Sequence, residues 1–105
     1  MEFKRLQTVE RSASGLLTEA EVMELEIALM LKPEAGALIP GGKGLRKLRR
    51  PLADRGKSGG ARVIYYYISD DATIYLVFIY AKNRQPDLTK DQLATLAKFV
   101  ASQIP

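Results

Sequence analysis

Residues 61–80 of the chain read ARVIYYYISDDATIYLVFIY, and this stretch decides the fold. It contains two runs rich in β-branched and aromatic residues, Ala61 to Ile68 and Thr73 to Tyr80, and each has the length of a strand. The four residues between them, Ser69 to Ala72, have the composition and length of a hairpin turn. The stretch therefore predicts two antiparallel strands that lie side by side.

A third strand is predicted upstream of this hairpin. Leu45 to Arg50 mixes apolar and basic residues, as expected of a strand with one face in the core and one in solvent. The connection to the hairpin, Arg55 to Gly60, is basic and glycine-rich, and its backbone amides can approach a phosphate closely. A surface loop without a ligand is an equally good interpretation, because the spacing of a P-loop is missing.

Helices are predicted on both sides of the strands. Thr18 to Glu21 and Thr89 to Gln92 both have the capping-box pattern that opens a helix. Apolar residues at helical spacing follow each box: Val22, Leu25 and Leu29, with Ile27, Met30 and Leu31 widening the stripe, and then Leu93, Leu96 and Val100. The first helix should end near Leu31, before Pro33 and Gly36. At the N-terminus, residues Glu2 to Ser14 are consistent with a short strand followed by a helical turn.

This order of elements predicts an α+β fold. We expect a small antiparallel β-sheet of at least three strands, with the N-terminal helices and the C-terminal helix packed on one face. The opposite face would then be free for a ligand. The length of 105 residues and the hydrophobic content of 47% correspond to a single domain over residues 1–105.

The sequence contains neither cysteine nor histidine. Disulfides, the usual zinc sites, and nucleophile pairs built on histidine or cysteine are therefore excluded. We predict no metal and no small-molecule cofactor. The N-terminus has no apolar signal region and no stretch approaches the length of a membrane span, so we expect a soluble cytoplasmic protein with no membrane partner.

The positive charge is concentrated in the middle of the chain. Residues 43–84 contain ten basic and three acidic residues, whereas residues 1–42 contain four basic and seven acidic ones. Basic charge gathered on one part of a small fold is typical of a protein that binds a polyanion, although a solvated surface gives the same pattern. Because side chains alternate along a strand, Lys47 and Arg49 share a face, and we expect Arg62 to join them on the solvent side.

Tyrosines are the second feature of the predicted strands. The five, Tyr65, Tyr66, Tyr67, Tyr75 and Tyr80, are candidates for stacking against the bases of single-stranded RNA. At least half of them should instead lie in the core, because the buried face of the sheet needs large apolar groups.

Three ordered stretches resemble one protein family. GLRKLR at 44–49, GARVIYY at 60–66 and IYAKN at 79–83, with the following Asp87-Leu88-Thr89 helix start and the Leu-x-x-x-Pro-x-x-Gly pattern at 29–36, are similar to the HigB branch of the RelE/ParE toxin superfamily. The resemblance covers roughly Leu17 to Val100. It implies a small antiparallel sheet flanked by helices, ribosome-dependent cleavage of mRNA, and neutralisation by a cognate, DNA-binding antitoxin protein.

The resemblance also implies the site. Matched by position, the candidate catalytic residues are Lys47, Arg49, Arg62 and Lys82. Tyr80 is a further candidate because it could replace the base that is missing from this sequence. The neighbouring basic residues, Lys43, Arg46, Arg50, Arg55, Lys57 and Arg84, are candidates for RNA binding. Two positions depart from the RelE pattern, because Asn83 stands where RelE has an arginine and 86–91 lacks the tyrosine expected near the last helix.

The expected reaction is attack by a ribose 2′-OH on the adjacent phosphorus, with no metal. Arg62 would stabilise charge on the phosphorus centre, Lys47 and Arg49 would hold phosphates, and Lys82 would act as acid or base, with Tyr80 as a substitute base. Two alternatives stay open, a ParE-like toxin that acts on gyrase and a nucleic-acid-binding module without catalysis.

Overall fold

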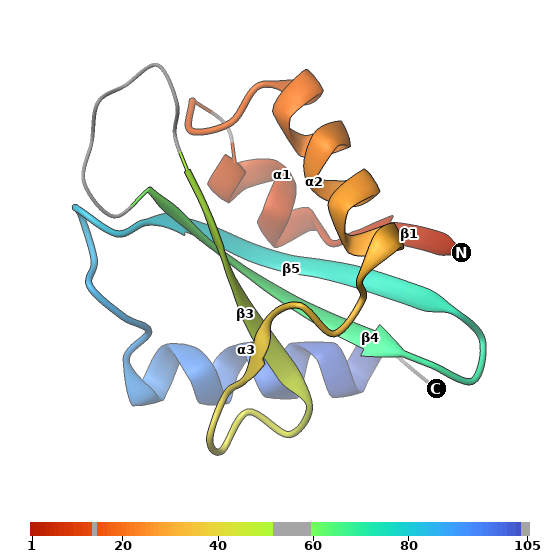
Figure 1. Cartoon of the computed structure of the whole chain (residues 1–105). Helices are drawn as coiled ribbons and strands as arrows, with labels where there is room; N and C mark the ends of the chain where they lie inside the picture. Colours follow the sequence, from red (N-terminus) through yellow and green to blue (C-terminus); the bar gives the residue numbers. More distant parts are fainter. Residues whose placement is uncertain (14, 52–59, 104–105) are drawn as a thin grey trace.

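The computed structural model describes residues 1–13, 15–51 and 60–103 (Figure 1). The elements follow in the order β1 (Glu2–Arg5), α1 (Gln7–Ala13), α2 (Glu19–Leu31), β2 (Ala37–Leu38), β3 (Leu45–Arg50), β4 (Ala61–Ile68), β5 (Thr73–Ala81) and α3 (Lys90–Gln103). The predicted strands and both predicted helices are confirmed, and β5 runs one residue further than expected. Within the part of the chain described, no helix has the length and apolar run needed to cross a membrane.

In the ranges described, the strands form one five-stranded sheet in the order β1-β5-β4-β3-β2. The β2–β3, β3–β4 and β4–β5 pairs are antiparallel, whereas β1 pairs with β5 in parallel, with Phe3 opposite Ile74. The expected antiparallel sheet of at least three strands is confirmed for β2 to β5, and the parallel β1 at the edge was not predicted. A long helical segment leads out of β1, so no tight hairpin turn forces an antiparallel neighbour.

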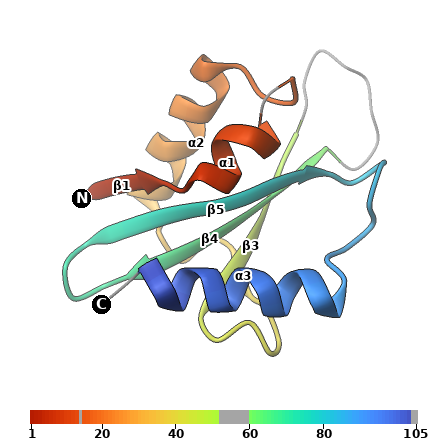
Figure 2. The same ribbon diagram turned by 180° about the vertical axis from the view of Figure 1, so that it is seen from behind.

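The helices cover both faces of the sheet. Helices α1 and α2 pack on the face of the sheet that carries Val63 and Tyr65. Helix α3 packs on the opposite face, where its Leu96 belongs to the same core cluster as Ile64. Figures 1 and 2 show α3 behind the strands in one view and in front of them in the other. The expectation that all helices lie on one face is therefore wrong.

The reason is visible in β4 itself. Its first five residues, Ala61 to Tyr65, are all buried, so side chains on both faces of the strand are covered. A strand without polar alternation needs a packing layer on each side of the sheet.

Both capping boxes form as the sequence predicts. The Thr18 hydroxyl accepts a hydrogen bond from the Glu21 amide, and the Glu21 carboxylate accepts one from the Thr18 amide. Thr89 and Gln92 exchange the same pair of bonds at the start of α3. These bonds satisfy backbone donors that a helix start would leave unpaired.

An irregularity in the β4–β5 pairing affects the end of β5. The register shifts between Ile64 and Tyr65, and as a result Val77 and Phe78 both pack on the α3 side. A bulge of this kind inserts one extra residue and changes which face the following side chains occupy. It places Tyr80 on the α3 side of the sheet, opposite Arg62 in the pairing.

Candidate nucleic-acid interface

Three neighbouring strands bring candidate residues into one row. Arg49 of β3 lies opposite Arg62 of β4, and Arg62 lies opposite Tyr80 of β5. Lys47 stands two residues before Arg49 and shares its face, since side chains alternate along a strand. The expected grouping of Lys47, Arg49 and Arg62 on one face is therefore confirmed.

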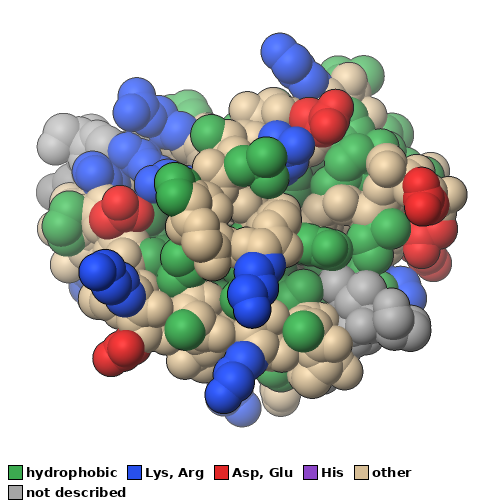
Figure 3. Space-filling model, turned by 90° about the horizontal axis from the view of Figure 1, so that it is seen from below, with side chains coloured by type: hydrophobic (Ala, Val, Ile, Leu, Met, Phe, Trp, Pro, Cys, Tyr) green, Lys and Arg blue, Asp and Glu red, His purple; other side chains and the backbone are tan. Residues whose placement is uncertain are grey.

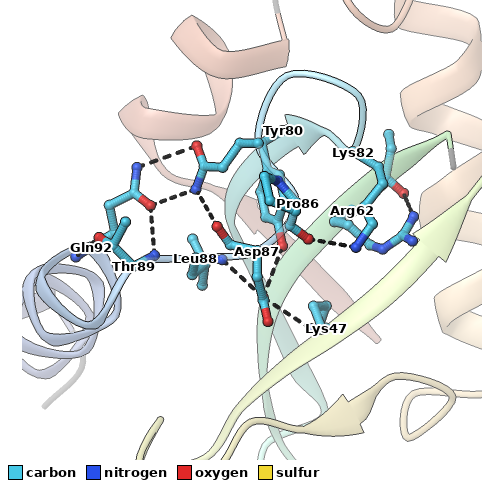
Figure 4. A network of polar contacts seen from close by, with 11 residues as sticks. Lys47, Arg62, Tyr80, Lys82, Pro86, Asp87, Leu88, Thr89 and Gln92 are labelled. Carbon is cyan, nitrogen blue, oxygen red and sulfur yellow. Dashed lines mark hydrogen bonds and ion pairs between the residues drawn. The ribbon is translucent and has the colours of Figure 1, made fainter.

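Lys82 joins this row because the chain turns sharply after β5. Its backbone amide donates to the Gly60 carbonyl over 2.9 Å, which fixes it beside the start of β4. Its ammonium group donates to the Pro86 carbonyl over 2.7 Å. Figure 4 shows Lys82 near Arg62, with the segment after β5 folded back toward Lys47.

That segment also carries Asp87 into the basic group. The Lys47 ammonium lies 3.1 Å from Asp87 Oδ1, the Leu88 amide donates to the same oxygen over 2.9 Å, and the Tyr80 hydroxyl lies 3.5 Å away (Figure 4). The Leu88 amide, and then Lys47, hold the pKa of the Asp87 carboxyl below its ordinary value. We call Lys47, Arg49, Arg62, Tyr80, Lys82 and Asp87 the strand-end cluster.

The sequence did not identify Asp87 as a site residue, although Asp87 belongs to the predicted start of the last helix. The available signal was an acidic side chain shortly after the last strand of a basic face. Its partner Lys47 lies 40 positions earlier in the chain, however, and no local pattern links the two.

Tyr80 is a proton donor in this arrangement. Burial, and then the negative charge of Asp87, raise the pKa of the Tyr80 hydroxyl to about 12. The phenol therefore keeps its proton near neutral pH, which argues against Tyr80 as a general base.

Arg62 is buried more deeply than the sequence suggested. Its residue is only 7% exposed, and one guanidinium nitrogen lies 3.4 Å from the Ala61 carbonyl. The expectation of a solvent-side arginine is wrong, because α3 and the segment after β5 cover much of this face. Arg49, by contrast, is exposed, and no hydrogen bond or ion pair of its side chain is found among the described residues.

The other candidate RNA-binding residues are spread more widely. Arg46 lies on the opposite face of β3, where it donates to the Gly36 carbonyl over 2.7 Å and pairs with Glu34. Arg50 shares that opposite face. Lys43 precedes Leu45, the first residue of β3, and so lies at the other end of this strand from Arg49. Arg84 is exposed in the turn after β5, beside Tyr80 in a hollow that Ser12 also lines. Arg55 and Lys57 lie outside the described residues.

Most of the tyrosines do not offer an open ring. Tyr65, Tyr75 and Tyr80 are buried, and Tyr66 and Tyr67 are partly buried. The expectation that at least half lie in the core is confirmed, and base stacking on this sheet would have to use other surfaces.

The charge of the molecule is uneven on its surface. In the view from below, Lys and Arg side chains gather on the left, with acidic side chains among them (Figure 3). No group of three or more carboxylates that could hold a metal ion is found in the ranges described. The cations of the strand-end cluster can bind an anion, and Lys82 and Tyr80 carry protons that they can donate.

Comparison with known proteins gives a consistent result. The family model described as "RelE toxin of RelE / RelB toxin-antitoxin system" matches residues 6–104. A chain of the intact E. coli RelBE toxin-antitoxin complex is similar in structure, with a TM-score of 0.54, 14% identity, and coverage of 76% of this chain and 94% of that one. A mutant of E. coli toxin RelE in the free state has a TM-score of 0.55, 14% identity, and coverage of 99% and 97%. At this identity the two structures show a shared fold.

Proposed function

This chain belongs to the family of RelE toxins of the RelE/RelB toxin–antitoxin system, and we propose that it acts in the cytoplasm as a ribosome-dependent mRNA endoribonuclease. Its assignment to the HigB branch is part of the same proposal and is supported by the stretches at 44–49, 60–66 and 79–83.

One observation carries the proposal: Arg49 and Arg62 stand directly opposite each other in the β3–β4 pair. Lys47 and Lys82 add to the positive charge beside them. An anion placed at this row is attracted by several cations at once, and guanidinium groups bind phosphate oxygens with strong, charge-assisted hydrogen bonds. The phosphodiester backbone of mRNA is the anion that a RelE-family protein would meet on the ribosome.

The proposed chemistry needs only the residues of the strand-end cluster. The 2′ oxygen forms a bond to phosphorus, the bond from phosphorus to the 5′ oxygen breaks, and the products are a 2′,3′-cyclic phosphate and a 5′-OH. Lys47 and Arg49 hold phosphates, and Arg62 stabilises the charge that develops on the phosphorus centre. Lys82 accepts the proton of the 2′-OH and passes it to the leaving 5′ oxygen, and the protonated Tyr80 hydroxyl donates a hydrogen bond to that oxygen.

The proposal is tested by mapping mRNA ends in a translation reaction that contains the purified protein. We expect cuts within codons that depend on ribosomes, and expression of the chain alone should arrest growth. Intact mRNA with loss of gyrase activity would favour the ParE-like alternative. RNA affinity without cleavage would favour a binding module.

A cognate, DNA-binding antitoxin is the partner that the proposal implies. Acidic segments should contact the strand-end cluster, because complementary charge favours association there. A complex that left Lys47, Arg49 and Lys82 exposed would mean that the antitoxin instead blocks entry to the ribosome by its bulk.

RNA binding by the purified protein should depend steeply on salt, because Lys47 and Arg49 release counterions from the phosphates they neutralise. Each contact contributes a slope of about 0.7 on single strands, so Lys47→Ala and Arg49→Ala should each lower the slope by about that amount. Binding is measured by fluorescence anisotropy over a salt series. The control is Lys32→Ala, an exposed lysine at the end of α2, and an unchanged slope in both test variants would place the RNA elsewhere.

Asp87→Ala should slow cleavage about tenfold, or ~1.4 kcal/mol, because Lys47 and Tyr80 would lose the carboxylate that positions them. Stability should change little, since the Lys47–Asp87 pair is largely exposed to solvent and such pairs contribute less than about 1 kcal/mol. Single-turnover cleavage is compared with that of Asp91→Ala, a change to an exposed acid in the first turn of α3. Faster cleavage by Asp87→Ala would mean that Asp87 competes with phosphate for Lys47.

A further inference from the structure

A hollow of about 370 Å³ lies beside the Lys47–Asp87 ion pair. The residues that line it come from three parts of the chain: 37–40 in and after β2, Lys47 in β3, and 87–90 with Leu93 at the start of α3. Pockets for small ligands occupy about 300 to 1,000 Å³, so the hollow has room for a compact ring system.

Its walls are mainly apolar. Leu38, Ile39 and Pro40 form one wall, and Leu88 and Leu93 belong to the other. The Leu38 residue is 59% exposed, so part of this apolar wall is open to a ligand. A flat, weakly hydrated ring between these walls would remove apolar surface from water on both of its faces.

The ion pair at the edge of the hollow has unused bonding capacity. All three hydrogen bonds to the Asp87 carboxylate, from Lys47, Tyr80 and the Leu88 amide, end on Oδ1. Within the described part of the chain, none ends on Oδ2. A carboxylate oxygen accepts hydrogen bonds and cannot donate them when it is ionised, and the pKa of Asp87 is lowered.

We propose that this hollow binds a nucleobase that carries an exocyclic amino group, with the phosphate of the same nucleotide on Lys47. This inference rests on the proposed function, and it adds a base-binding subsite to a cluster that would otherwise contact only the RNA backbone. The apolar walls bind the ring, and Asp87 Oδ2 accepts from the amino group.

The chemistry of Asp87 selects among the four bases. Adenine, guanine and cytosine each present an amino group, whereas uracil has a carbonyl oxygen at the corresponding position. A carboxylate beside that oxygen would repel it, since both groups only accept hydrogen bonds. The subsite should therefore discriminate against uracil.

Mononucleotides test the subsite without the ribosome. AMP, GMP, CMP and UMP are titrated into the full chain, and the methyl resonances of Leu38, Ile39, Leu88 and Leu93 are followed by NMR. We expect those methyl groups to shift with the first three and to respond at least fivefold more weakly to UMP. Ribose 5-phosphate, which lacks a base, should leave them unchanged. Equal responses to all five compounds, or none, would overturn the inference.

Two variants alter the hollow from the exposed β2 side. Ala37→Trp should fill it, and Leu38→Ser should remove part of one wall, so mononucleotide binding should weaken about three- to tenfold. The matched control is Leu31→Ser, which changes an apolar residue that is 81% exposed at the end of α2, outside the hollow. Circular dichroism checks that all three remain folded.

Mapping of mRNA ends with the same variants separates this inference from the proposed function. If the parent cleaves mRNA and Ala37→Trp shifts or relaxes its base preference, the subsite is supported. If the parent cleaves and both hollow variants keep its preference, the subsite is wrong and the nuclease proposal stands. If the parent does not cleave but the methyl groups discriminate among mononucleotides, the nuclease proposal fails and the base subsite stands.

Discussion

Arg62→Ala is expected to slow single-turnover cleavage of mRNA on the ribosome by about 100- to 1,000-fold. The guanidinium lies in the middle of the row formed by Arg49, Arg62 and Tyr80, and its burial holds it in place before substrate arrives. Removal of a preorganised donor that stabilises developing charge costs about 2.7 to 4 kcal/mol. Ribosome affinity should fall far less, because Lys47 and Arg49 remain.

Arg62→Lys is the informative companion. Lysine keeps the charge but lacks the planar fork that donates two parallel bonds to a phosphate, so cleavage should stay mostly defective. Full cleavage by Arg62→Lys, or parent-like cleavage by Arg62→Ala, would move the assignment to Lys82.

Thermal stability is measured on the same preparations, since a buried arginine can also support the fold. A pairing of Arg62 with Asp70 is excluded as a structural role, because Asp70 follows the opposite end of β4, and six residues of strand already separate Arg62 from Ile68 by about 20 Å. Joint loss of melting temperature and activity would nevertheless show that Arg62 acts mainly on the fold.

Tyr65→Ala is expected to lower the free energy of unfolding by about 3 to 5 kcal/mol, the range for removal of a large buried ring. The Tyr65 residue is fully buried against α2 and its neighbours. Its hydroxyl accepts from the Gly36 amide over 2.8 Å and donates to the Pro33 carbonyl over 2.7 Å. These two bonds tie the segment after α2 to the sheet.

Tyr65→Phe separates the ring from its hydroxyl. The ring stays, but the Gly36 amide and the Pro33 carbonyl lose their partner, so a loss of about 1 to 3 kcal/mol is expected. Tyr66→Phe is the matched control, since no hydrogen bond of the partly buried Tyr66 hydroxyl is found among the residues described. Urea unfolding measures all three. A stability of Tyr65→Phe equal to that of the parent would mean that water replaces both bonds.

The same contact explains why the Leu-x-x-x-Pro-x-x-Gly pattern needs its glycine. A Cβ at Gly36 would stand 2.7 Å from the Tyr65 ring and 2.9 Å from the Lys47 carbonyl. Glycine is therefore required at position 36 because the sheet lies too close for a side chain. The sequence pattern shows the glycine but not the residues that it contacts.

The sequence by itself determined α2, β3, β4, β5 and α3, and the shared face of the basic residues, but it did not predict β2. Hydrophobic periodicity, capping boxes and turn composition depend on residues within a few positions of one another, so α2, α3 and the β4–β5 hairpin could be placed from them. The alternation of side chains likewise put Lys47 with Arg49. Arg62 was grouped with them on the assumption that it faces solvent; the grouping is confirmed but the assumption is wrong.

Only the tertiary structure decided the parallel direction of β1, the covering of the second sheet face by α3, the burial of Arg62 and the pairing of Asp87 with Lys47. Each depends on segments that are far apart in the chain. Local patterns specify which residues seek burial or charge partners, but the packing of distant elements selects the partner.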